Sequence, residues 1–444
     1  MSPSINDEAM GDAAVRSDWV PADDYVSPHF MAQENEKVWP QVWQIACREQ
    51  ELPDVGSYLT YEINDFSIVI VRTKNGIRAY HNVCPHRGRQ LVGDRGVITG
   101  FQCRYHFWKF DLDGNNVEVV DRSDWNCLLD DKDIALKRVH VANWGGWIFI
   151  SLAENPAPLE DFLGEIWKRL SAYRLEEMSI LWHRTIEFPC NWKVALEAFS
   201  EGYHVQATHQ QLLDYNDDRT YSEGLGDHGL FSYPRLRGLA QGSPRTINPP
   251  REDVRHTLVE YFDTMIRDLN AMFTQREADE IRRLPDEVSA DASYEEVITA
   301  FRRLQREAAE KSGVELPQLA PEQLKSAGGS YHIFPNMVIL PMPLAALYYR
   351  ARPNGSPDSC IFDIIALERW APGKEPKWER EFSNDPKDRD FWGLVLLQDF
   401  SNMAAVQRGM KSPAFKAART NPKQEVAISN FHKALHAYID GSRP

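Results

Sequence analysis

The stretch NVCPHRGRQLVGDRGVITGFQCRYHFW, residues 82–108, contains two short clusters that each pair one cysteine with one histidine. One residue separates Cys84 from His86, two separate Cys103 from His106, and sixteen lie between the two pairs. A structural zinc site usually groups its cysteines in one pair and its histidines in the other. One thiolate and one imidazole from each loop instead favour a two-iron cluster, in which the thiolates bind one iron and the imidazoles bind the other.

The composition sets limits on the function. The chain of 444 residues is 43% apolar and 26% charged, as expected for a globular protein of two or three domains. Its net charge of −15 argues against nucleic-acid binding, which needs a basic surface. The polar, acidic start MSPSINDEAMGDAAVRSD lacks the features of a signal peptide, and no apolar run reaches the roughly 20 residues that span a bilayer. We therefore expect a cytoplasmic protein with reduced thiols.

Strand signals dominate residues 38–152. The segment SYLTYEINDFSIVIVRTKNGIRAYHNV alternates apolar and polar residues and turns at Asn75-Gly76, and a second turn, Asp113-Gly114, follows the second Cys/His cluster. The stretch AENPAPLEDF reads as a linker. We expect an N-terminal segment (1–37), an all-β domain that carries the Cys/His loops (38–155), and a second domain (156–444).

Residues 251–327 read as a helical excursion within the second domain. Apolar residues recur there at helical spacing, namely Val254, Leu258, Phe262, Met265, Leu269 and Met272. A capping box of Ser293 and Glu296 predicts the start of a further helix, and Gly313 its end. Strand-like segments resume after residue 327, so the second domain mixes helices and strands.

The stretch NWKVALEAFSEGYHVQATH, residues 191–209, offers Glu197, Glu201, His204 and His209. On a helix, positions 201 and 204 share a face, whereas five residues rotate His209 about 140° away from His204. Both imidazoles can meet one ion only if the helix ends or bulges between them. We expect that irregularity at residues 206–208.

A carboxylate would complete a two-histidine, one-carboxylate triad, which is diagnostic of non-heme Fe(II) oxygenases. Asp399 is a candidate, because it is polar within the otherwise apolar segment FWGLVLLQDFSNMAAVQRGMKS. Taken alone, the two histidines would more often be packing or surface residues, and Asp399 is weaker still. The alternative that residues 191–209 are ordinary core therefore stays open at this point.

The three pieces together resemble Rieske non-heme iron oxygenases. The paired Cys/His motif near residue 85, Asn-Trp-Lys with two histidines near residue 205, and an aspartate ahead of Gln-Arg-Gly near residue 400 follow the family's order. The resemblance is to the α (oxygenase) subunit of the aromatic-ring-hydroxylating dioxygenase family, from about residue 38 to the C-terminal region. It implies an α+β fold, with an N-terminal all-β Rieske domain and a helix-grip (Bet v1-like or START-like) catalytic domain built on an antiparallel sheet.

The resemblance also implies the ligands and the assembly. A Rieske [2Fe–2S] cluster would be held by Cys84, His86, Cys103 and His106, and a mononuclear Fe(II) by His204, His209 and Asp399. Family members are homotrimers or α3β3 assemblies with a small β subunit, in which electrons pass between subunits through a bridging acid. Glu201 takes the position of that acid here.

Three residues depart from the family's usual pattern. Phe107 follows the second cluster histidine, where Gly or Ala is common, so the packing or shielding of the cluster edge is expected to differ. Glu201 stands in place of the usual Asp, which lengthens its reach by one methylene. Ala198 stands where an Asn is frequent, and the role of that amide is therefore absent. For Glu197, a structural role and a role at the site are equally compatible with the sequence.

The expected function is that of a terminal oxygenase, which uses O2 and electrons to hydroxylate an aromatic or other hydrophobic substrate. We expect no dinucleotide-binding fingerprint, so the electrons would come from NAD(P)H through a separate ferredoxin or reductase. Monooxygenation or oxidative demethylation is the alternative, and Glu201 is similar to the Glu of some quaternary-ammonium-oxidising members. A Rieske-type electron carrier or a zinc-binding protein is the non-enzymatic alternative.

The cluster window is basic in an acidic chain. Residues 84–109 carry five basic side chains against the single acid Asp94, namely Arg87, Arg89, Arg95, Arg104 and Lys109. Such a patch can guide an acidic electron donor toward the cluster. A solvated face, or pairing across a subunit contact, is an equally good interpretation.

Overall fold

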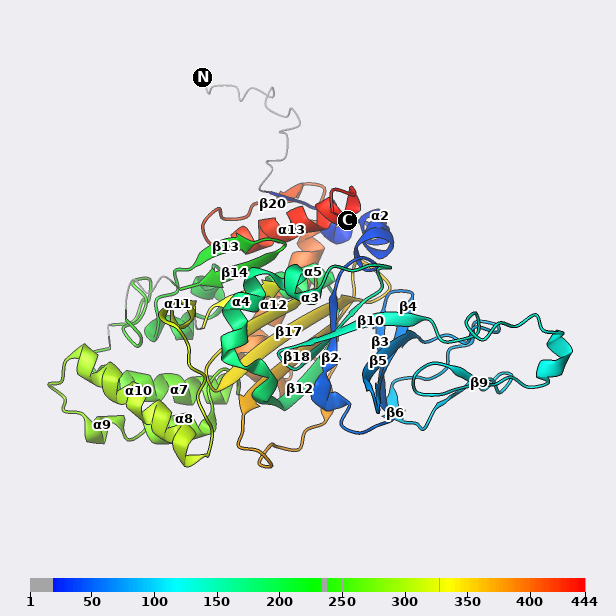
Figure 1. The fold of residues 1–444 in the computed structure, drawn as a ribbon. Coiled ribbons are helices and arrows are strands. Elements are labelled where there is room, and N and C mark those ends of the chain that lie inside the picture. The colour runs from blue at the N-terminus through cyan, green and yellow to red at the C-terminus, as the bar shows by residue number, and fades with distance from the viewer. Residues whose placement is uncertain (1–18, 234–237, 250, 327, 444) are drawn as a thin grey trace, which may run out of the picture.

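The computed structural model describes residues 19–233, 238–249, 251–326 and 328–443. Residues 1–18 of the expected N-terminal segment lie outside this part of the chain. Two largely antiparallel sheets dominate the fold, with helices beyond the C-terminal sheet and at one end of both sheets (Figure 1). The α+β fold expected from the sequence is confirmed.

The N-terminal sheet has seven strands in the order β2-β11-β10-β5-β4-β3-β6, and a separate sheet of three short strands, β7-β8-β9, lies beside it. The predicted turn at Asn75-Gly76 joins β4 to β5, with Thr73 opposite Gly76. The strands are β2 (Gln44–Arg48), β3 (Ser57–Ile63), β4 (Phe66–Thr73), β5 (Gly76–His81), β6 (Arg95–Val97), β7 (Phe101–Gln102), β8 (Lys109–Phe110), β9 (Asn116–Glu118), β10 (Arg138–Trp144) and β11 (Trp147–Ser151).

The C-terminal sheet has eight strands in the order β13-β14-β15-β16-β17-β18-β12-β19. All neighbours are antiparallel except β12 and β19. The strands are β12 (Met178–Phe188), β13 (Tyr221–Leu225), β14 (His228–Ser232), β15 (Ser330–Ile333), β16 (Met337–Pro341), β17 (Ala345–Pro353), β18 (Cys360–Arg369) and β19 (Arg380–Phe382).

Both faces of this sheet are covered, which explains why every residue of β17 is buried. Tyr348 points toward the N-terminal sheet and lies 4.6 Å from Trp147, ring centre to ring centre. Tyr349 points the other way and stacks on Phe199 at 3.7 Å, in the core that includes helices α5 (Trp192–Glu197) and α12 (Arg389–Met410). The alternation of β17 therefore divides the interior into two apolar layers.

A buried charge cluster joins the two sheets. Asp363 of β18 accepts hydrogen bonds from Arg350 at 2.7 Å and from Arg380 at 2.9 Å. Arg350 also donates to backbone carbonyls of β2, and Arg352 donates to the carbonyl of Glu62 in β3. Because unpaired buried charges are costly, this network fixes how the two sheets pack together.

The helical excursion lies between two strands that pair with each other, since Leu230 of β14 is opposite Tyr331 of β15. Its helices are α7 (Val254–Asp268), α8 (Gln275–Ile281), α9 (Leu284–Glu287), α10 (Tyr294–Lys311) and α11 (Pro321–Ser326). The predicted capping box is confirmed, because the side chains of Ser293 and Glu296 each bond the other's backbone at the start of α10. Figure 1 shows α7–α10 at the opposite end of the molecule from the loops around β9.

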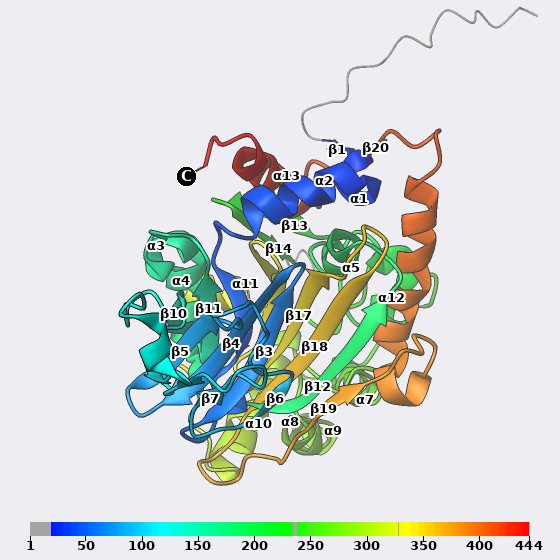
Figure 2. The ribbon, with the colours of Figure 1, turned by 90° about the vertical axis from the view of Figure 1, so that its right-hand side faces the viewer.

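The two ends of the described chain meet over the C-terminal sheet. Helices α1 (Asp23–Val26) and α2 (Pro28–Gln33), the π-helical turn η2 (Glu34–Val38) and α13 (Val426–Ile439) gather at one end of the sheets (Figure 2). Lys193 of α5 and Glu34 of η2 form a fully buried ion pair, 2.6 Å between Nζ and Oε1. The N-terminal segment therefore packs directly on the element that leads into the histidine region.

The expectation that the chain has no Gly-x-Gly-x-x-Gly fingerprint was wrong, because the spacing does occur. A Gly-x-Gly-x-x-Gly string occurs at residues 224–229. It forms the hairpin of β13 and β14, not a strand-to-helix turn. A Cβ at Gly224 or Gly229 would lie within 3 Å of Asn430 or Ala427 of α13, so these glycines permit close packing of that helix. Among the described residues, none of the helices combines the length and the apolar content needed to cross a bilayer.

Candidate metal centres

The two Cys/His loops have matching backbone geometry. The first follows β5, and the second connects β7 to β8. In the first loop, Cys84 donates its N–H to the carbonyl of Arg89 at 2.8 Å and accepts from the N–H of Gly88 at 3.0 Å. In the second, Cys103 donates to Trp108 at 2.9 Å and accepts from Phe107 at 2.9 Å. Each cysteine thus begins a similar tight turn, and the two turns face each other.

The loops bring the predicted cluster ligands together. Both cysteines are buried free thiols, and the rings of His86 and His106 lie 4.5 Å apart, centre to centre. The Nδ1 atoms of both histidines are buried and have no hydrogen-bond partner among the described residues. Since buried polar atoms are nearly always paired, two orphaned imidazole nitrogens beside two thiols fit a [2Fe–2S] cluster.

Backbone N–H groups also face the sulfur atoms. Burial raises the pKa of Cys84, although the N–H groups of His86 and Arg87 act in the opposite direction. At Cys103 burial also disfavours the thiolate, but the N–H groups of Tyr105 and His106 outweigh it and lower the pKa. Such donors stabilise thiolate ligands and adjust the reduction potential of a cluster.

His86 is enclosed by two indole rings. Trp108 stacks on it with ring centres 4.8 Å apart and an interplanar angle of 6°, and Trp125 meets it edge-on at 5.7 Å. Trp108 lies beside the ligands in sequence, but Trp125 comes from a later loop that the sequence analysis did not include in the site. Aromatic cover of this kind excludes water from one face of a ligand.

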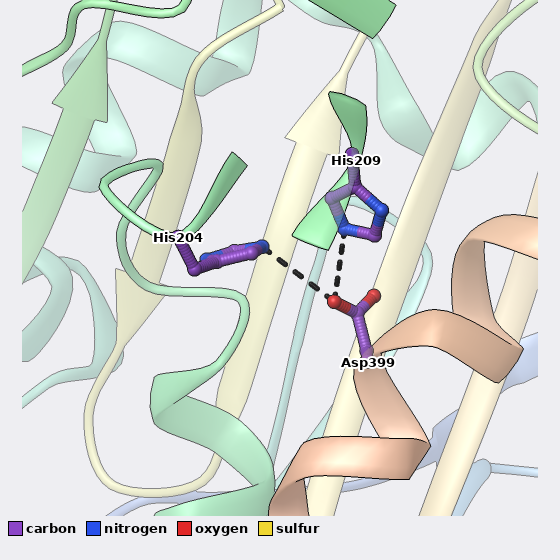
Figure 3. A group of neighbouring side chains, drawn as sticks. All are labelled: His204, His209 and Asp399. Atoms are coloured by element: carbon purple, nitrogen blue, oxygen red, sulfur yellow. Dashed lines mark hydrogen bonds and ion pairs between the residues drawn. The ribbon is translucent and has the colours of Figure 1, made fainter. Parts of the chain in front are cut away.

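The second centre joins residues from two distant segments. His209 Nε2 lies 2.9 Å and His204 Nε2 lies 3.5 Å from the same oxygen of Asp399, Oδ1. One ligand atom from each of these residues falls within 4.8 Å of the others. Figure 3 shows both imidazoles turned toward the Asp399 carboxylate, which projects from α12. These residues could hold one metal ion and leave further coordination positions open.

The helix between the two histidines ends at the second histidine, not at residues 206–208 as expected. Residues 206–208 are helical, within α6 (Val205–Thr208), so the predicted irregularity there is wrong. His204 precedes this short helix, and His209 ends it with φ −117° and ψ 50°. The backbone leaves the helix at His209 itself, which turns that imidazole back toward Asp399.

A carboxylate and an amide contact the Nδ1 atoms of the two imidazoles, on the side away from Asp399. Glu201 lies before α6, not on a helix shared with His204, and its Oε1 lies 2.6 Å from His204 Nδ1. Its other oxygen accepts from the N–H groups of Tyr203 and His204. Burial disfavours the charged His204 ring, but Glu201 outweighs it and raises the pKa to about 9. Glu201 therefore orients this imidazole.

Gln398 orients the imidazole of His209, as Glu201 orients that of His204. Its Oε1 lies 2.8 Å from His209 Nδ1, and its amide exchanges hydrogen bonds with Gln211. This glutamine was not predicted from the sequence, although its position next to Asp399 was a usable signal. A ligand histidine usually has such a partner on its other nitrogen.

Glu197 is not part of the triad. Its carboxylate accepts from the hydroxyl of Tyr25 at 2.8 Å and lies 2.7 Å from His432 Nε2. His432 also bonds Asp24, and all four residues lie at the junction of the two chain ends. The sequence did not indicate this group, because its members lie between 172 and 408 positions from their partners and only the fold brings them together.

The basic window divides into two kinds of side chain. Lys109 pairs with Glu118 at 2.6 Å, and Arg95 with Glu51 at 3.6 Å. The side chains of Arg87 and Arg104 belong to exposed residues on the cluster loops, and Arg87 packs over the ring of Tyr105. Charge available to a partner is therefore concentrated on the loops themselves.

A β domain with two paired Cys/His turns, followed by a sheet domain with a two-histidine, one-carboxylate group, defines the architecture of a Rieske-type oxygenase subunit. Residues 42–128 match the Rieske [2Fe–2S] domain family, and residues 167–441 match the ring hydroxylating alpha subunit (catalytic domain) family. The chain belongs to this ring-hydroxylating alpha-subunit family, whose catalytic domain is that of non-heme iron oxygenases.

Curated relatives are oxygenase subunits of monooxygenases. The glycine betaine monooxygenase oxygenase subunit of Pseudomonas aeruginosa is 33% identical over 191 residues, which cover 43% of this chain and 44% of that protein. The carnitine monooxygenase oxygenase subunit of Escherichia coli is 32% identical over 203 residues, or 44% of this chain and 53% of that protein. The matched region thus spans about half the length of these relatives.

Solved structures share the whole fold. A quaternary ammonium Rieske monooxygenase, CntA, aligns over 95% of this chain and 96% of its own, with a TM-score of 0.64 and 19% identity. Naphthalene 1,2-dioxygenase from Rhodococcus aligns over 96% of this chain and 95% of its own, with a TM-score of 0.64 and 18% identity. The fold is therefore common to enzymes that act on very different substrates.

Proposed function

We propose that this chain is the oxygenase subunit of a multicomponent Rieske monooxygenase that oxidises a quaternary ammonium compound. The observation that carries the proposal is the convergence of His204, His209 and Asp399 in a chain that also pairs Cys84 and His86 with Cys103 and His106. In the reaction, O2, two electrons, two protons and a substrate C–H bond give C–OH and water. Hydroxylation beside a quaternary nitrogen then leads to loss of the carbon as an aldehyde.

The chain's own residues have defined parts in this proposal. Cys84, His86, Cys103 and His106 would hold the [2Fe–2S] cluster, and His204, His209 and Asp399 the Fe(II). The bound metals would supply stored electrons and an open site for O2. Glu201 and Gln398 orient the two iron-site imidazoles through 2.6 and 2.8 Å contacts to their Nδ1 atoms.

Two lines of support favour a quaternary ammonium substrate over the aromatic one first expected. The curated relatives described above oxidise glycine betaine and carnitine, as their names state. Tyr233 is partly buried, which raises its pKa, and Tyr261 and Glu201 lie within electrostatic range and raise it further. Aromatic rings within range of a carboxylate suit a cation that cannot donate hydrogen bonds.

The electrons are proposed to come from NAD(P)H through a ferredoxin or reductase, and the working form to be a homotrimer or an α3β3 assembly. The exposed arginines of the cluster loops support docking of an acidic donor. Glu201 would then link the two metal sites across a subunit boundary, since its carboxylate already holds His204 from behind.

The test is a product assay with labelled oxygen. Purified protein, a compatible reductase and NADH are incubated under ¹⁸O2 with glycine betaine, carnitine, choline, naphthalene or indole. We expect oxygen uptake and aldehyde release only with the quaternary ammonium compounds. Ring diols from naphthalene would instead support aromatic dihydroxylation, and colourless protein containing zinc would reject the oxygenase proposal altogether.

A further inference from the structure

The two histidines of the iron site have different groups at their Nδ1 atoms. His204 Nδ1 lies 2.6 Å from a carboxylate oxygen of Glu201, whereas His209 Nδ1 lies 2.8 Å from the amide oxygen of Gln398. Both oxygens of a carboxylate accept hydrogen bonds, but an amide has one end that accepts and one end that donates. The amide of Gln398 therefore supports a metal-binding imidazole in only one of its two orientations.

The orientation of the Gln398 amide determines which ring nitrogen of His209 is free to bind a metal. Because Oε1 of Gln398 accepts, Nδ1 carries a proton, and the neutral ring keeps the lone pair of Nε2. This Nε2 lies 2.9 Å from Asp399 Oδ1, at the shared ligand position (Figure 3). With the amide turned over, its NH2 group would face Nδ1 and favour the tautomer that has its proton on Nε2. That tautomer cannot bind the metal through Nε2.

Gln211 holds the amide of Gln398 through two hydrogen bonds. Its Nε2 donates to Gln398 Oε1 at 2.8 Å, and its Oε1 accepts from Gln398 Nε2 at 3.2 Å. If Gln398 alone turned over, oxygen would face oxygen and NH2 would face NH2 at these two contacts. Gln398 therefore keeps its orientation unless Gln211 turns over with it.

The contact is made between the two segments that supply the ligands. Gln211 lies in the short 3₁₀ helix η7 (Gln210–Asp214), which begins directly after His209. Gln398 lies on α12 and immediately precedes Asp399. Both glutamines are partly buried, whereas His209 and Asp399 are buried. The pair of amides thus joins the segment of one ligand to the helix of the other.

We propose that Gln211 is a positioning residue of the iron site, which acts through Gln398 to keep the Nε2 lone pair of His209 available to the metal. The inference rests on the proposed function through the metal site alone and does not depend on the substrate. Its two hydrogen bonds go to Gln398, so its effect on the metal passes through that amide. His204 needs no such residue, because both oxygens of Glu201 accept.

The test measures metal binding in protein that retains its cluster and has been treated with a chelator to remove the mononuclear metal. Co(II) is added, and its affinity is measured by equilibrium dialysis, with the Co(II) EPR spectrum as a record of ligand geometry. Binding that is lost in Asp399→Ala is assigned to the triad. Gln211→Leu removes both hydrogen bonds at nearly constant volume. Gln210→Leu makes the same change at the neighbouring exposed position and is the matched control.

We expect Gln211→Leu to bind Co(II) about tenfold more weakly than the parent protein, with a broader EPR spectrum, because the imidazole of His209 is no longer held in one tautomer. Gln210→Leu should match the parent. Gln211→Glu should keep most of the affinity, because a carboxylate there still accepts from Gln398 Nε2. Equal affinities of the parent and Gln211→Leu would overturn the inference.

A further pair of variants distinguishes positioning from packing. In Gln398→Glu both side-chain oxygens accept, so the group beside His209 Nδ1 has no wrong orientation. Adding Gln211→Leu to this variant should weaken Co(II) binding by no more than about twofold. If Gln211→Leu weakens binding by the same factor in both backgrounds, Gln211 acts through packing and the inference fails. A parent protein whose Co(II) binding is unaffected by Asp399→Ala would overturn the metal site, and with it both the proposed function and this inference.

Discussion

Gly88 and Phe107 occupy equivalent positions in the two cluster loops. Each donates its backbone N–H to the cysteine carbonyl four residues earlier, and each has a left-handed backbone, with φ of 75° at Gly88 and 59° at Phe107. The turn therefore requires a positive φ in both loops, and only one loop fills it with glycine. The unusual Phe107 is a strained residue that is 55% exposed.

Phe107→Gly should relieve this strain. Left-handed backbone costs an L-residue about 1–2 kcal/mol, and part of that is offset by the greater freedom of glycine in the unfolded chain, so we expect a gain of roughly 0.5–1 kcal/mol. The reciprocal change, Gly88→Ala, meets no atom within 4 Å of the new Cβ and isolates the backbone cost. Gly88→Ala should lower the free energy of unfolding by about 1 kcal/mol. Denaturant unfolding of metal-free protein measures the change in the free energy of unfolding for each variant. If both variants are stabilised or both are destabilised, Gly88 and Phe107 are not equivalent positions.

Glu201→Gln should separate orientation of the iron site from its assembly. The amide is neutral and cannot match the charged contact to His204 Nδ1, so turnover should fall roughly 10–100-fold. The cluster should still form and be reduced, because Glu201 does not contact its ligands within this subunit. The decisive observation is reoxidation of the reduced cluster in a single turnover with substrate and O2, which should stall. Normal reoxidation would mean that Glu201 does not connect the two centres.

The stability of metal-free protein should depend on pH through His432 and Asp24. The pKa of His432 is raised from 6.5 to about 9, so its stabilisation is complete below pH 6.5 and is lost as the pH rises through 9. Burial raises the pKa of Asp24, but His432 and His436 outweigh this and lower it to about 2, so its contribution is lost as the pH falls toward 2.

Between about pH 6 and pH 9.5 the free energy of unfolding should therefore fall by an amount on the order of 3 kcal/mol from this group. Denaturant titrations at several pH values test this, with His432→Gln as the comparison. If the variant shows the same alkaline loss as the parent protein, the loss does not come from His432.

Charge reversal on the cluster loops should weaken docking of the electron donor. Arg87→Glu together with Arg104→Glu changes exposed side chains beside the ligands, so donor-dependent reduction should slow and become less sensitive to salt. Lys109→Gln is the control, because Lys109 already pairs with Glu118. Stopped-flow measurement of the rate of cluster reduction compares the double variant with the control. Equal rates in the double variant and the control would reject docking at these loops.

The sequence was most informative where chemistry depends on short spacings. Within each of the Cys84–His86 and Cys103–His106 pairs, the cysteine and the histidine lie only a few residues apart. The two loops could therefore be predicted from the sequence, as could the capping box at Ser293. A break in the helix was predicted at residues 206–208, but the helix runs through them and ends at His209. His209 contacts Gln398 and Asp399 of α12, and local sequence does not encode these distant contacts.

Contacts between residues far apart in the sequence could not be predicted either, because local sequence does not encode them. Asp24 and His432 are 408 positions apart and meet only because α1 and α13 pack over the same end of the sheet. Trp125 reaches His86 through a loop with three left-handed non-glycine residues, namely Asp121, Asn126 and Cys127. A left-handed backbone is uncommon for residues other than glycine, so sequence patterns do not predict it at these positions.

If the chain holds two separate metal centres, a count of the bound metals is the most direct test. Iron and acid-labile sulfide are measured in the reconstituted protein and in Asp399→Ala. We expect three irons and two sulfides per chain in the parent, and two of each in the variant, with the cluster spectrum unchanged and substrate oxidation lost. A third iron retained by Asp399→Ala, or a parent protein without a third iron, would contradict this expectation.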